Sequence, residues 1–175
     1  MAPSDRQNQR TLGAILLNPP LTSGQATMRH LQVAADVLGC GSVGIANLFA
    51  IPTRSVTAIN EVGRNSMGWE SARPKLEDVL ATSTELVAGW GVSGLYGLAA
   101  ANFRAQISWL HAWFQDGSRL PSMWTLDGES RHPSRWHQYV SDRHGRATGA
   151  TFRERLESVL RHTSIPMHPP ACPRS

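Results

Sequence analysis

Short apolar runs alternate with segments of helical spacing along this sequence, and the alternation limits the folds open to the chain. Residues 11–17 (TLGAILL) are continuously apolar, as expected of a strand that is covered on both faces. Three further runs have strand character: 42–50, 85–90 and 122–126. Segments with helical spacing follow each of the four runs: 26–38, 73–82, 96–114 and 151–162. This order predicts an α/β fold, a three-layer α/β/α sandwich around a four-stranded parallel sheet.

The 175 residues fit a single domain, because a chain of this length buries most of its apolar surface around one core. Residues 1–10 are polar and residues 166–175 are rich in proline, so we expect two loose tails. The domain itself is predicted to span residues 11–165. We expect it to be a monomer.

Several classes of protein are disfavoured by what the sequence lacks. No apolar run approaches the roughly 20 residues of a membrane helix, and the first residues do not form a secretory signal. Cys40 and Cys172 lack the spacing of a zinc site, and no Walker loop, GxGxxG or HExxH motif is present. We therefore expect no membrane contact, no metal and no cofactor, and we place the protein in the reducing cytoplasm.

The positive charge comes almost entirely from arginine, with Lys75 as the single lysine and a net charge of +4. Arginine binds phosphate through two parallel hydrogen bonds and stacks on bases, which favours a nucleic-acid partner. GC-rich genomes also favour arginine over lysine, so composition alone leaves the partner open.

Polar or aromatic residues follow all four predicted strands. In parallel α/β sheets, ligands bind beyond the carboxyl ends of the strands. The relevant segments are 18–20 (NPP), 47–49 (NLF), 90–91 (WG) and the loop 127–136. We expect these segments to converge on one cleft.

Two asparagines at these strand ends suit both structural and functional roles. Asn18 can hold a water through its carbonyl oxygen, or it can simply start the loop as an Asx-turn. Asn47 has apolar neighbours, and a buried amide must find partners in the backbone or in a ligand. Phe49 beside it can stack on a base or belong to the core.

The loop after the fourth strand contains His132, followed by arginines and aromatic residues. A neutral imidazole can donate a hydrogen bond to an oxygen that gains negative charge. Arg135, Arg143 and Arg146 suit phosphate contacts, and Trp136 suits insertion between bases. The alternative is an ordinary basic loop with Trp136 folded inward.

Taken together, the four strand-end segments resemble an uncharacterised bacterial family with LNPS, NLF, WG and HP motifs in this order. Beyond that family, the pattern resembles the uracil-DNA glycosylase superfamily over residues 11–162. Asn18-Pro19-Pro20 is similar to the first motif of that superfamily, which positions a water, and His132-Pro133-Ser134 is similar to its last motif. The resemblance implies that Asn18 and His132 are catalytic.

The resemblance also implies that Asn47, Phe49 and Pro20 surround the base. It places Ser134, Arg135 and Trp136 on DNA, with Trp136 where the superfamily carries the residue that replaces an extruded base. Pro20 is a departure, because uracil-specific members carry a tyrosine there that excludes pyrimidines substituted at C5. An acidic segment of the bacterial family is also missing and reads 24–27 (GQAT) here.

The function implied is a DNA glycosylase that hydrolyses the N-glycosidic bond of a flipped-out uracil or C5-modified pyrimidine in double-stranded DNA, in repair or in defence against phage. Two alternatives remain open at this point. One is a non-catalytic nucleic-acid-binding module of the same fold. The other is an N-glycosidase that acts on free nucleosides or nucleotides.

Overall fold

The computed structural model describes residues 10–116, 120–141 and 149–163. Its strands are β1 (Thr11–Leu16), β2 (Ser42–Asn47), β3 (Glu85–Ala88), β4 (Ser122–Leu126) and β5 (Leu160–Thr163). Its helices are α2 (Gln25–Leu38), α3 (Val56–Val62), α4 (Met67–Glu70), α5 (Arg73–Thr82), α6 (Gly97–Asp116), α7 (Trp136–Tyr139) and α8 (Phe152–Val159), with a 3-10 turn η1 (Pro133–Arg135). The predicted α/β class is confirmed.

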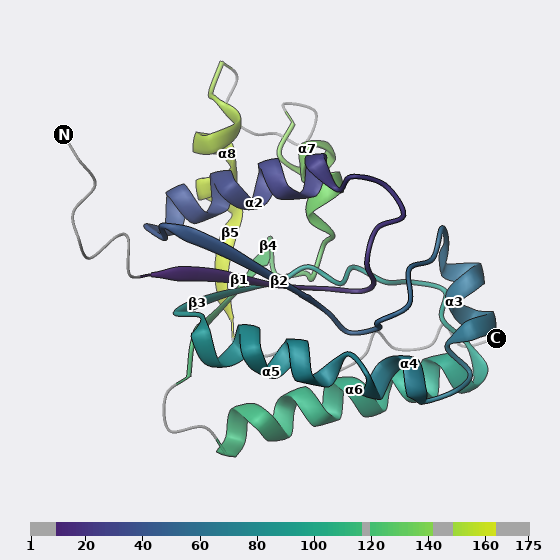
Figure 1. The fold of residues 1–175 in the computed structure, drawn as a ribbon. Helices are drawn as coiled ribbons and strands as arrows, with labels where there is room; N and C mark the ends of the chain where they lie inside the picture. The colour runs from purple at the N-terminus through teal and green to yellow at the C-terminus, as the bar shows by residue number, and fades with distance from the viewer. Residues whose placement is uncertain (1–9, 117–119, 142–148, 164–175) are drawn as a thin grey trace.

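The strands form one sheet in the order β2-β1-β3-β4-β5. The first four are parallel, while β5 runs antiparallel to β4. Helices cover both faces of the sheet: α2 and α8 lie on one side, and α5 and α6 lie on the other (Figure 1). The chain therefore has a mostly parallel sheet flanked by helices, with five strands rather than the predicted four.

The core consists of two apolar clusters, one on each face of the sheet. Successive side chains of a strand point to opposite faces, so β1 contributes Ile15 to the α5–α6 side and Leu12, Ala14 and Leu16 to the α2–α8 side. All four side chains are almost fully buried. This two-sided burial explains why the run 11–17 lacks polar alternation.

The prediction of a final helix over 151–162 is correct only for its first part. Thr151 forms a capping box with Glu154, and α8 then ends at Val159. The following residues are extended and pair with β4, placing Leu160 opposite Leu126 and His162 opposite Trp124. Pairing satisfies the free edge of β4, which is a tertiary contact that helical spacing does not reveal.

Most other predicted elements lie where the sequence placed them. The helix over 73–82 has the predicted bounds, and α2 ends before Gly39, whose φ of 67° suits a glycine. Strands β2 and β3 end two or three residues earlier than predicted, and the short helices α3 and α4 were not predicted. Within the described part of the chain, no helix has both the length and the apolar character needed to cross a membrane.

Candidate functional site

The four strand-end segments, which we expected to converge on one cleft, lie at the carboxyl edge of the sheet. Neither of the two cavities described below is lined by all four of them. Leu16 of β1 is aligned with Asn47 of β2, and the Leu48 amide donates to the Leu16 carbonyl at 2.8 Å. On the other side of β1, the Gly89 amide donates to the Ile15 carbonyl at 2.8 Å. The chain segments after β1, β2 and β3 therefore leave the sheet side by side.

A glycine brings the end of β3 against the loop that carries His132. A Cβ atom built on Gly91 would lie 2.6 Å from the backbone nitrogen of His132 and 2.9 Å from the Ser130 carbonyl oxygen. Both neighbours are backbone and cannot move aside easily. The WG motif thus has a physical meaning here, because a side chain at Gly91 would separate the two segments.

Asn18 is half-buried and held by its amide nitrogen. Nδ2 donates to the Thr53 hydroxyl at 3.1 Å, to the Thr53 carbonyl at 3.3 Å and to the Pro19 carbonyl at 3.1 Å. These contacts fix which amide atom faces the backbone, and no described residue donates to Oδ1. The carbonyl oxygen of Asn18 is therefore available to accept from a water or a ligand.

Asn47 ends β2 with an unsatisfied group. Its Oδ1 atom is buried and has no hydrogen-bond partner among the described residues. A buried acceptor in this state costs about 1–3 kcal/mol. The oxygen lies at the carboxyl edge of the sheet, where parallel α/β folds bind ligands, which makes Asn47 a candidate ligand contact.

The protonation state of His132 follows from its contacts within the HPS segment. Nδ1 accepts from the Ser134 amide at 3.2 Å and lies 2.8 Å from the Ser134 hydroxyl. A nitrogen that accepts carries no proton, so the proton of the neutral ring lies on Nε2. Burial lowers the pKa of His132, and the nearby Arg135 lowers it further. His132 is thus a neutral donor through Nε2.

Helix α2 holds the HPS segment in place from the side. His30 Nδ1 lies 2.6 Å from the Pro133 carbonyl oxygen, and because a carbonyl can only accept, Nδ1 is the donor. The His30 ring also stacks on Phe152 of α8, with 4.8 Å between ring centroids. His30 therefore connects α2, α8 and the segment that carries His132.

His132 lines two cavities. The first, which we call the β1-side cavity, has a volume of about 320 Å³. It lies between the segment 20–27, which includes the first residues of α2, and the residues His132 and Ser134. The second, the β3-side cavity, has a volume of about 430 Å³ and lies between the loop after β3 and the loop before η1. Neither cavity is lined by Asn18 or Asn47, although Pro20 is two residues from Asn18.

The structure corrects two predicted roles. Phe49 has no exposed surface and packs against Trp69, with 4.7 Å between ring centroids. Trp136 also has no exposed surface, and its Nε1 donates to the Arg131 carbonyl at 2.8 Å. A ring that is enclosed in the core cannot stack on a base or enter a base stack. Both residues act in the core, the alternative reading that the sequence left open.

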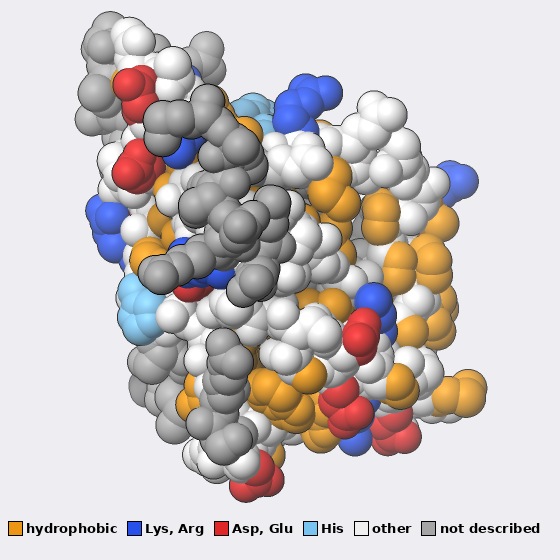
Figure 2. Space-filling model, turned by 60° about the vertical axis from the view of Figure 1, so that its left-hand side comes forward, with side chains coloured by type: hydrophobic (Ala, Val, Ile, Leu, Met, Phe, Trp, Pro, Cys, Tyr) orange, Lys and Arg blue, Asp and Glu red, His pale blue; other side chains and the backbone are white. Residues whose placement is uncertain are grey.

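The predicted DNA-binding residues are placed in part. Ser134 orients His132, while Arg135 is exposed and lines the β3-side cavity. Arg143 and Arg146 lie outside the described residues. On the face drawn in Figure 2, described Lys and Arg side chains are spread among acidic and apolar ones and do not gather in one patch.

Sequence reasoning missed several residues that organise the site. Thr53 follows the NLF segment by four residues, but its contact with Asn18 depends on a loop geometry that spacing does not reveal. Gln106 of α6 is fully buried and donates to the Leu48 carbonyl at 3.0 Å, next to Asn47. A polar residue on the apolar face of a helix was the available signal for Gln106.

Among the described residues, no group of three His, Cys, Asp or Glu side chains is placed to hold a metal ion. A search of curated proteins and a search of solved structures found no match. A scan against protein-family models matches residues 4–134, more than half of the chain, to a family described as "Protein of unknown function (DUF1643)". The matched segment contains the ends of all four parallel strands, together with Asn18, Asn47 and His132. The chain therefore belongs to the DUF1643 family.

Proposed function

We propose that this protein is a DNA glycosylase that hydrolyses the N-glycosidic bond of a flipped-out uracil or C5-modified pyrimidine. The family description assigns no activity, so the proposal depends on the resemblance of the motifs and on the chemistry of the site. The observation that carries it is the state of His132. A neutral ring with its proton on Nε2 lies beside a cavity that Pro20 also lines.

In the proposed reaction, the bond between the base nitrogen and C1′ breaks and its electron pair leaves with the base. His132 donates from Nε2 to a base oxygen that gains negative charge. Asn18 accepts from the attacking water through Oδ1, which orients the water but cannot deprotonate it. The water oxygen bonds to C1′, and its lost proton goes to solvent or to the base.

Asn47 supports the part of the proposal that concerns a pyrimidine. Its buried Oδ1 lacks a donor, and the edge of a pyrimidine base carries N–H groups that would supply one. Pro20 has no aromatic ring to press against C5 of the base, so bases substituted at C5 remain candidate substrates. Uracil itself is supported by the motif resemblance alone.

The burial of Trp136 favours a second candidate, an N-glycosidase that acts on free nucleosides or nucleotides. Enzymes that act inside a duplex must extrude the base and fill the gap. Trp136 cannot fill a gap from its buried position. The free-nucleotide reading does not need such a residue, and it uses Asn18 and His132 in the same way.

The decisive experiment measures abasic-site formation on DNA that carries uracil, thymine mismatches or C5-modified pyrimidines, with free nucleosides tested in parallel. We expect base release from at least one DNA substrate, and we expect binding of that DNA to weaken steeply as salt rises. Release from nucleosides alone would favour the second candidate. DNA binding without base release from any substrate would contradict the enzymatic proposal and favour a non-catalytic nucleic-acid-binding module.

A further inference from the structure

The residues that line the β3-side cavity are of the kinds found in binding sites, and Asn18 is not among them. The apolar wall of the cavity includes Trp90, Phe103 and Tyr139. Its charged residues are Arg131, Arg135 and Glu129, so the two arginines outnumber the carboxylate. A volume of about 430 Å³ lies in the range of roughly 300–1,000 Å³ that is typical of small-molecule sites. A nucleoside monophosphate is a small molecule of the size that such sites bind.

Arg131 supplies the observation that points to a ligand. Its guanidinium lies over the Tyr139 ring at 3.8 Å from the centroid, and its Nη2 lies 3.2 Å from Glu129 Oε2. Its Nε is buried and has no hydrogen-bond partner among the residues described. One guanidinium face is therefore covered by an aromatic ring, while a buried donor in the guanidinium plane is unused.

The rest of the lining narrows the ligand class. Arg131 and Arg135 together favour an anion, and arginine binds phosphate with defined geometry. The aromatic residues favour a planar ring, because bases stack on aromatic side chains. A phosphate joined to a planar base satisfies both requirements, whereas phosphate alone would leave the apolar wall without a contact.

We propose that the β3-side cavity binds a nucleotide, with its phosphate on Arg131 and Arg135 and its base along the wall that includes Trp90 and Tyr139. The nucleotide is either a free nucleoside monophosphate or one unit of a nucleic-acid strand that passes through the site. This inference does not require glycosylase activity. Because His132 lines the cavity as well, a nucleotide bound there lies next to the candidate reaction centre.

The test is isothermal titration of the full chain with uridine and adenosine 5′-monophosphates, the matching nucleosides, inorganic phosphate and a single-stranded hexanucleotide. We expect binding of the monophosphates or of the hexanucleotide, at least tenfold tighter than binding of nucleosides or of phosphate alone. Saturation by monophosphates identifies the free nucleotide as the ligand. Saturation by the hexanucleotide alone identifies a strand.

Arg131→Gln is expected to weaken nucleotide binding at least tenfold. Because Arg131 also packs on Tyr139, the thermal midpoint of the Arg131→Gln variant is measured to check that it is folded. Arg135→Gln is the second variant, because the Arg135 side chain is exposed and its loss should not affect folding. Arg104→Gln, an exposed arginine of α6 that does not line the cavity, is the matched control and should bind as the wild type does.

Three results would overturn the proposal: no nucleotide binding by the wild type, equal binding by Arg135→Gln and by the control, or phosphate binding as tight as nucleotide binding. Asn18→Ala separates this proposal from the enzymatic one. It should lose base release but still bind nucleotide, since Asn18 lines neither cavity.

Discussion

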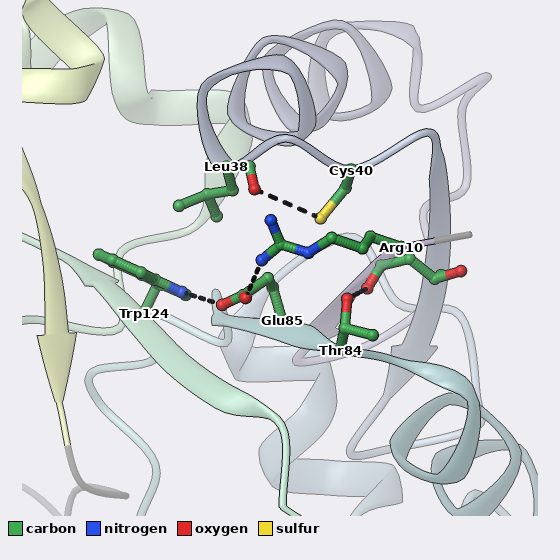
Figure 3. A network of polar contacts seen from close by, with 7 residues as sticks. Arg10, Leu38, Cys40, Thr84, Glu85 and Trp124 are labelled. Atoms are coloured by element: carbon green, nitrogen blue, oxygen red, sulfur yellow. Dashed lines mark hydrogen bonds and ion pairs between the residues drawn. The ribbon is translucent and has the colours of Figure 1, made fainter. Parts of the chain in front are cut away.

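The two ends of the sheet differ in how their polar groups are satisfied. At the amino end, Glu85 begins β3 and accepts from Arg10 through one oxygen and from Trp124 Nε1 at 2.6 Å through the other (Figure 3). At the carboxyl end, Asn47 Oδ1 and Arg131 Nε are buried without partners among the described residues.

The difference separates stability from binding. Burial raises the pKa of the Cys40 thiol at the amino end, which keeps it protonated, and its Sγ lies 3.9 Å from the Leu38 carbonyl oxygen. Paired groups of this kind hold the chain together and leave nothing for a ligand. Unpaired buried groups lower stability, so those at the carboxyl edge of the sheet are candidate contacts for a ligand.

The largest expected effect is the loss of base release when a polar side chain at the carboxyl end of the sheet is removed from a chain that stays folded. His132→Ala and Asn18→Ala should each reduce base release by about 10²–10³-fold, as the loss of one positioned donor or acceptor usually does. Both side chains are half-buried, so the thermal midpoints should stay close to that of the wild type. His137→Ala is the control, because His137 is an exposed histidine a few residues along the chain. Base release by both variants at the wild-type rate would remove the assignment.

The next largest effect concerns the stability that the paired groups at the amino end of the sheet provide. Glu85→Ala should lower the free energy of unfolding by about 2 kcal/mol, because it removes two hydrogen bonds to a nearly buried carboxylate. The loss should be smaller than the 3–5 kcal/mol typical of fully buried pairs, since the Arg10 side chain is 42% exposed. Urea denaturation measures it, and base release by the folded variant should not change.

Lys75→Ala is the matched control for the amino end. Lys75 pairs with Asp78 at 2.9 Å, and both side chains are more than half exposed. An exposed pair contributes little, so a change within about 0.5 kcal/mol is expected. If Lys75→Ala cost as much stability as Glu85→Ala, burial would not be what distinguishes the network at the amino end.

A smaller effect compares two asparagines, one whose amide oxygen is unpaired and one whose amide is fully hydrogen-bonded. Asn47→Leu removes a buried, unpaired amide oxygen and introduces an apolar side chain of similar size, which should raise the free energy of unfolding by about 1 kcal/mol. Base release should fall at least tenfold, because the donor from the ligand loses its acceptor. Chemical denaturation measures the expected gain in stability, and the release assay measures the expected loss of activity.

Asn60→Leu should behave in the opposite way. Asn60 is buried, donates to the Gly94 carbonyl at 2.9 Å and accepts from the Tyr96 amide at 3.0 Å. Its replacement removes both hydrogen bonds of a buried amide, which should cost about 1–3 kcal/mol. Equal stability changes for the two asparagines would contradict the distinction between satisfied and unsatisfied amides.

The smallest effect concerns pH. The pKa of His132 is lowered from 6.5 by burial and by Arg135, so the active neutral ring should persist below pH 6.5. The rate of base release should therefore stay level from pH 8 to pH 6.5 and fall only at lower pH. An inflection above pH 6.5 that disappears in His132→Asn would contradict this.

The same shift has a consequence for stability. Below pH 6.5 the unfolded chain takes up a proton at His132 before the folded chain does, so the free energy of unfolding should fall as pH decreases towards the folded pKa. Above pH 6.5 both states are neutral and this dependence disappears. Arg135→Gln should move the pKa of His132 upward, which an NMR titration of the ring measures.

Local pattern was enough to predict much of the fold. The bounds of α5, the end of α2 at Gly39 and the four parallel strands follow from periodicity and from glycine and proline signals. The common edge of the strand ends also followed, because parallel strands place their carboxyl ends at one edge. The single cleft expected there stays a prediction, since Asn18 and Asn47 line neither cavity. Strand β5 could not be predicted, since Leu160 and its neighbours are extended by pairing with β4 and not by their own sequence preference.

The sequence by itself determined which chemical groups stand at the strand ends: the amides of Asn18 and Asn47 after β1 and β2, and the imidazole of His132 on the loop after β4. Only the tertiary structure decided what each group can do. It buried Phe49 and Trp136, paired Asn18 Nδ2 with Thr53, and turned His132 so that Ser134 fixes its proton on Nε2. The physical reason is that burial and hydrogen-bond partners come from segments far apart in the chain, whereas motif spacing describes neighbours.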